Sequence, residues 1–140
     1  MNFLVFLDGQ AGELEKILSG TKRMLVKEFD PARSAVQPAS PGDSLYLLRK
    51  KDDCDLRAKA TVVRVLFLTN RMDEDLSQIL KEMQTRLQLT EDQYIYWSGK
   101  KQVWLVEFDC AHKIDMIHVS SDKVLDRSDW IAFEAFSQII

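Results

Sequence analysis

The sequence has few of the residues that build metal centres, disulfide frameworks or membrane spans. It holds two cysteines, Cys54 and Cys110, two histidines and no Cys-x-x-Cys motif. This is too few cysteines for a disulfide framework and is not typical of a zinc site, so we expect reduced thiols and neither a metal nor another cofactor. No apolar run approaches the roughly 20 residues that cross a bilayer, and the N-terminus lacks the basic segment of a signal peptide. We therefore expect a soluble, cytoplasmic protein with no membrane partner.

The chain also lacks an excess of positive charge. Nineteen Lys and Arg face 22 Asp and Glu, which gives a formal net charge of −3. Proteins that neutralise many phosphates of a long duplex are normally basic, so duplex DNA is not an expected partner. A small basic patch for a short single strand or a small ligand is compatible with this balance. The 140 residues, 46% of them hydrophobic, predict one domain over residues 1–140.

Proline is scarce, and all three prolines fall between Asp30 and Gly42, which predicts a loop there. Period-2 and period-3.6 patterns elsewhere predict strands and helices. The predicted strands are 3–7, a strand carrying Lys22 to Lys27, 44–48, 57–68, 102–110 and 116–119. The predicted helices are 10–19, 72–87 and a short one from the capping-box residue Thr90 to Gly99. The charged run 49–55 reads as a hairpin tip, and residues 126–140 fit either a strand or a helical turn.

These elements predict an α+β fold. Most connections are too short for parallel crossovers, so the sheet should be mixed and curled toward a barrel, with two or three helices. Trp104, Val106, Phe108 and Cys110 alternate on one predicted strand, which favours a packing role for this thiol.

The most informative stretch runs from Ile17 to Lys27. A helical pattern stops at Ser19-Gly20, and a strand bearing Lys22, Arg23 and Lys27 begins at once. Glycine suits the residue after a helix, and cations are favoured at a helix C-terminus. The same pattern is expected of a well-capped connection and of the rim of a site for an anionic or carbonyl-rich ligand, and the residues alone leave both open.

This order of elements resembles the ASCH domains of the PUA-like superfamily of small β-barrels. Their helix ends in Gly-x-Lys-x-x-Glu-x-Arg, which Gly20 and Lys22 match, whereas the Glu and Arg positions hold Leu25 and Lys27. Their Pro-Gly-Asp turn before a strand matches 41–43, and their late aromatic strand is similar to 103–108. The resemblance covers about residues 3–110, leaving 111–140 as a C-terminal extension of the same domain. It implies a PUA-like mixed, curled β-barrel.

The resemblance further implies that RNA or a modified nucleotide binds in a cleft beside the Gly20-x-Lys22 motif. The predicted ligand-binding residues are the motif and its neighbours together with two aromatic residues that could stack a base: Gly20, Thr21, Lys22, Lys27, Tyr46 and Trp97. One bacterial branch hydrolyses N4-acetylcytidine with a Lys, a Thr three residues later and a distant Glu. Lys22 and Glu82 would take the catalytic roles in such an amidohydrolase, although Leu25 stands at the Thr position. An interaction domain with a vestigial cleft is the third hypothesis; ligand identity and oligomeric state stay open.

Overall fold

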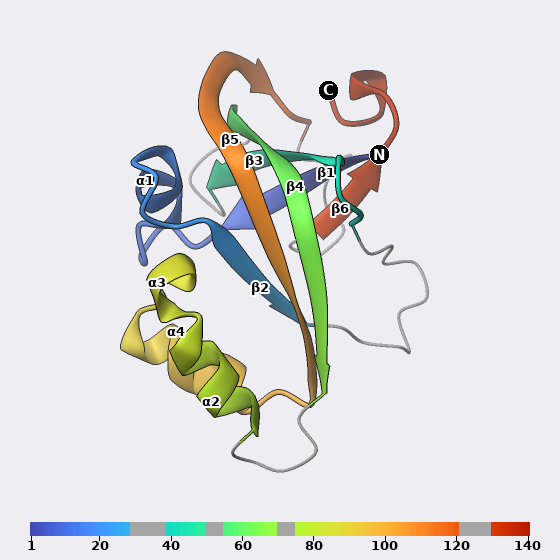
Figure 1. The fold of residues 1–140 in the computed structure, drawn as a ribbon. Helices are drawn as coiled ribbons and strands as arrows, with labels where there is room; N and C mark the ends of the chain where they lie inside the picture. Colours follow the sequence, from blue (N-terminus) through green and yellow to red (C-terminus); the bar gives the residue numbers. More distant parts are fainter. Residues whose placement is uncertain (29–38, 50–54, 70–74, 121–129) are drawn as a thin grey trace.

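The computed structural model describes residues 1–28, 39–49, 55–69, 75–120 and 130–140. Its strands are β1 (Asn2–Leu7), β2 (Met24–Glu28), β3 (Ser44–Arg49), β4 (Asp55–Thr69), β5 (Gln102–His118) and β6 (Trp130–Phe133). Its helices are α1 (Glu13–Leu18), α2 (Asp75–Glu82), α3 (Gln84–Leu87), α4 (Glu91–Ser98) and the short 3-10 helix η1 (Phe136–Gln138). Figure 1 shows α2, α3 and α4 gathered at one end of the molecule, with η1 near the other end.

One six-stranded sheet has the order β2-β5-β4-β3-β1-β6. β1 pairs with β3 in parallel, and the other neighbours are antiparallel. The sheet curls strongly: Trp104 on β5 and Trp130 on the terminal strand β6 lie four places apart in the strand order, yet their ring centroids are 5.0 Å apart. The predicted α+β fold with a mixed, curled, barrel-like sheet is therefore confirmed.

Apolar side chains pack in three clusters. The central core lies inside the curl and includes Phe3, Leu25, Trp104 and Trp130. The helix-side core packs α2 and α3 against the opposite face of β2 and β5, and the C-terminal core joins β6 and η1 to β1 and β3. Strand β2 and the first half of β5 are buried on both faces, because alternate residues enter different cores. Met24 and Val26 meet the helices, while Leu25 enters the central core.

Two helix and strand boundaries differ from the sequence prediction. The helix predicted over 72–87 is divided into α2 and α3 at Met83, whose φ of −91° and ψ of 4° are not helical. The two strands predicted over 102–110 and 116–119 are one strand, β5. Periodicity could not reveal this continuity, because the alternation is interrupted inside the strand.

The interruption is a bulge at Cys110. Between the register pairs Lys59↔His112 and Thr61↔Asp109, β5 advances by three residues while β4 advances by two, so β5 carries one extra residue. Cys110 has φ of +56° and is exposed. The prediction that Cys110 lies on the apolar face with Trp104 is therefore wrong, since the extra residue reverses the alternation. Most of the proline loop and the hairpin tip around Cys54 lie outside the described residues.

Candidate functional site

The predicted motif Gly20-x-Lys22 lies at the junction between α1 and β2. Gly20 adopts φ of +85°, a conformation that favours glycine, and this directs the chain from the helix into the strand. The N–H groups of Thr21 and Lys22 both donate to the carbonyl oxygen of Lys16 at 3.0 Å. The Thr21 hydroxyl donates to the same oxygen at 3.0 Å and lies 3.1 Å from the Ser19 hydroxyl. In this structure these hydroxyls cap the C-terminal end of α1 through the carbonyl oxygen of Lys16.

Lys22 is a buried lysine, with 1% of its surface exposed. Its ammonium donates a hydrogen bond to the carbonyl oxygen of Leu87 and lies 3.3 Å from Oε2 of Glu13. A second lysine, Lys16, donates to the carbonyl oxygen of Gln88 at 3.1 Å. Both ammonium groups therefore meet the C-terminal end of α3, where unpaired carbonyls and the helix dipole favour cations.

Burial lowers the pKa of Lys22, because the charged ammonium loses its hydration. The carboxylate of Glu13 opposes this by charge and by hydrogen bonding, whereas the ammonium groups of Lys16 and Lys27 lower the pKa further. Glu13 is itself held in place, since its Oε1 accepts a hydrogen bond of 2.8 Å from the Asp8 N–H. The motif lysine is thus a desolvated group with a fixed carboxylate partner.

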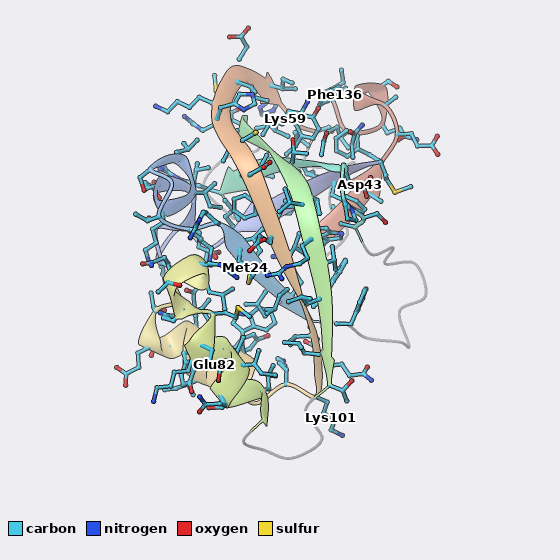
Figure 2. All side chains as sticks on the ribbon, in the orientation of Figure 1. Met24, Asp43, Lys59, Glu82, Lys101 and Phe136 are labelled. Carbon is cyan, nitrogen blue, oxygen red and sulfur yellow. The ribbon has the colours of Figure 1, made fainter. Side chains whose placement is uncertain are left out.

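The other predicted site residues lie in separate parts of the molecule. Glu82 is exposed on α2, where it accepts a hydrogen bond of 3.3 Å from Gln78, so the carboxylate partner of Lys22 is Glu13. Tyr46 is buried in the C-terminal core, its ring 5.1 Å from that of Phe136. Figure 2 shows Glu82 and Phe136 at opposite ends of the molecule.

Trp97 is partly buried against the helix-side core, with its ring edge-on to that of Tyr96 at 4.9 Å. Tyr96 is the more accessible ring of this pair, at 55% exposure. Of the residues predicted from the sequence, the structure brings together Gly20, Thr21 and Lys22. It leaves Tyr46, Trp97 and Glu82 with other neighbours.

Lys27 belongs to a row of side chains that crosses the sheet. Lys27 on β2 is the register partner of Trp104 on β5, which is in turn the partner of Phe67 on β4. Directly paired residues share a face, so all three lie on the central-core face, opposite to Met24. We call Lys27, Trp104 and Phe67 the cross-sheet row.

The cross-sheet row combines a cation, a buried indole and an accessible ring. Phe67 is 56% exposed, and its ring is nearly parallel to that of Trp104, with centroids 6.1 Å apart. Trp104 is buried, and its Nε1 has no hydrogen-bond partner among the described residues. A buried N–H without an acceptor costs about 1–3 kcal/mol.

Sequence reasoning identified Lys27 but missed Phe67 and assigned Trp104 to packing alone. The alternation of each strand was visible, but the register that places Phe67 beside Trp104 depends on the bulges between β4 and β5.

Within the described ranges, no group of three or more His, Cys, Asp or Glu residues could hold a metal ion. No helix in that part of the chain is long and apolar enough to cross a membrane.

No protein-family model and no curated protein matches this sequence. Solved structures do match its fold. The ASCH protein from Zymomonas mobilis superposes with a TM-score of 0.69 at 12% identity, covering 98% of this chain and 91% of that chain. A mutant form of it gives a TM-score of 0.70 at 9% identity, over 96% and 91% of the two chains. Protein EF3133 from Enterococcus faecalis V583 gives 0.54 at 14% identity, over 81% and 76%.

The likeness to the Zymomonas mobilis protein covers nearly the whole chain, including the C-terminal part for which the sequence motifs gave no counterpart. The resemblance drawn from Gly20, Lys22 and the order of elements is thus confirmed at the level of the fold. This chain has the fold of the ASCH protein from Zymomonas mobilis.

Proposed function

We propose that this protein binds single-stranded RNA or a modified nucleotide at the cross-sheet row. The observation that carries the proposal is the register itself, which sets a cation, a buried indole N–H and an accessible aromatic ring side by side on one face. A nucleotide offers the complementary groups, a phosphate for the cation and a planar base for the exposed ring.

Each member of the row has a distinct part in this proposal. Phe67 stacks the base, an interaction worth about 1–3 kcal/mol per base. Lys27 meets the phosphate as a point charge, without the two-pronged geometry that an arginine would supply. Trp104 is buried and supports the ring of Phe67 from inside the sheet. Lys22, which precedes β2, holds the end of α3 against the start of that strand.

Binding is tested by fluorescence anisotropy with a labelled single-stranded RNA and by thermal shift with nucleotides. Phe67→Ala should weaken binding by about 5-fold to 150-fold, the equivalent of about 1–3 kcal/mol. Ile95→Ala is the matched control, because Ile95 is also an exposed apolar residue but lies on α4. Equal affinities of the wild type and Phe67→Ala would contradict the proposal.

A second candidate function is hydrolysis of an acylated nucleoside, which the lowered pKa of Lys22 beside Glu13 favours. A desolvated lysine with a fixed carboxylate is a common feature of catalytic sites. Release of acetate from N4-acetylcytidine, followed by NMR, tests this candidate. Turnover that is lost in Lys22→Met and retained in Lys81→Met would select the hydrolase. Binding without turnover would select the binding function.

A further inference from the structure

A cluster of arginines lies on the face of the sheet opposite to the cross-sheet row. Glu107 on β5 is the register partner of Arg64 on β4 and of Met24 on β2, and Met24 belongs to the helix-side core. Oε2 of Glu107 lies 3.5 Å from NH2 of Arg64 and 3.5 Å from NH1 of Arg86 on α3. We call Arg64, Arg86 and Glu107 the arginine patch.

The arginine patch carries an excess of positive charge. Within the described part of the chain, Glu107 is the acidic partner of both arginines, so two guanidinium groups share one carboxylate oxygen. The side chains of Arg64 and Arg86 are 46% and 40% exposed, which leaves several N–H donors of each facing solvent. Two guanidinium groups on one carboxylate make a local positive patch on a chain whose net charge is −3.

The patch and the cross-sheet row can both be reached by one strand-like ligand. β4 pairs with β3 through Ala58 to Thr61, and Val62 exchanges backbone hydrogen bonds with Gly42 and Asp43; from Val63 to Thr69 the strand partner of β4 among the described residues is β5 alone. This half of β4 is therefore an edge, with Arg64 on one face and Phe67 on the other. Three residues of strand separate them, which is about 10 Å.

We propose that the arginine patch binds phosphates of a single-stranded RNA whose base lies on Phe67, so that the RNA strand crosses β4 between Arg64 and Phe67. This inference rests on the proposed function and makes it more specific, because it assigns the site to an oligonucleotide rather than to a mononucleotide. Guanidinium groups suit this role, since they bind phosphate oxygens through paired N–H donors.

The test is the salt dependence of RNA binding by the full chain. The logarithm of the affinity for a single strand falls with the logarithm of salt concentration by about 0.7 per neutralised phosphate. The double variant Arg64→Ala/Arg86→Ala loses two phosphate contacts, so it should reduce that slope by about 1.4 and bind RNA more weakly at low salt. The control is Arg49→Ala, because Arg49 is an exposed arginine paired with Glu15 on α1. Thermal melting of each variant checks that it is folded.

The outcomes separate this inference from the proposed function. A smaller slope in the double variant, with Arg49→Ala like the wild type, supports the patch. RNA binding that needs Phe67 but keeps the wild-type slope in the double variant overturns the patch alone. Binding of a mononucleotide as tight as that of an eight-nucleotide RNA also overturns it. No RNA binding by the wild type overturns both the patch and the proposed function.

Discussion

At the scale of single residues, the most unusual group is the ammonium of Lys22. It is enclosed by α1, α3 and β2, and it satisfies the carbonyl oxygen of Leu87 and the carboxylate of Glu13 at once. Removing one partner of a buried ion pair is far more costly than the net value of the pair, because the other partner is left uncompensated. Lys22 therefore links the helices to the sheet.

Lys22→Ala should lower the free energy of unfolding by about 3 kcal/mol, since it leaves Glu13 and the carbonyl of Leu87 without their partner and opens a cavity. Urea denaturation followed by circular dichroism measures this. Lys81→Ala, on the exposed face of α2, should stay within about 0.5 kcal/mol of the wild type. A loss below about 1 kcal/mol in Lys22→Ala would mean that the buried pair is not stabilising.

The same residue should make stability depend on pH. Because burial holds the pKa of Lys22 below its ordinary value of 10.5, the unfolded chain binds more protons than the folded chain between the two values. Below the folded-state pKa, the buried ammonium is charged and its desolvation lowers the free energy of unfolding in full. This destabilisation disappears as the pH rises toward 10.5. The unfolding free energy of the wild type minus that of Lys22→Met should therefore rise between pH 7 and pH 10 in a urea series. A fall over this range would show that the attraction of Glu13 outweighs desolvation.

At the scale of elements, the sequence predicted which faces the strands present better than where they end. The separation of Met24 and Val26 from Leu25 follows directly from period 2, and it holds in the structure. The position of Phe67 beside Trp104 could not be predicted, because register across a bulged ribbon depends on long-range pairing. The partner of Lys22 could not be predicted either, since the contact with Glu13 depends on the turn at Gly20 that folds Lys22 back against α1.

The bulge in β5 gives a prediction at this scale. Cys110 adopts φ of +56°, which is costly for a residue with a Cβ and most costly for a β-branched one. Cys110→Val should be less stable than Cys110→Gly by about 1–2 kcal/mol. Thermal or urea unfolding of the two variants compares them, and Cys110→Ser serves as the reference for loss of the thiol. Equal stabilities would indicate that the bulge relocates when its residue is changed.

At the scale of the whole molecule, the C-terminal residues are part of the fold rather than an appendage. β6 adds to the free edge of β1, and its Trp130 enters the central core beside Phe3. Phe133 and Ile139 enter the C-terminal core with Leu4 and Tyr46. The sequence motifs reached only to about residue 110, because the short strand β6 carries no periodic signal of its own.

Deletion of residues 130–140 should therefore abolish cooperative folding, although it removes none of the motif or cross-sheet residues. Burying a large apolar side chain contributes about 1.5–3 kcal/mol, so loss of Trp130, Phe133 and Ile139 removes about 5–9 kcal/mol, comparable to the whole stability of a typical domain. Loss of the sigmoidal urea transition and of dispersed amide NMR signals would be the expected result. A deletion of Ile140 alone, which is exposed at the end of the chain, is the control and should leave the transition in place. A truncated chain that still unfolds cooperatively would show that β1 to β5 close the central core without Trp130.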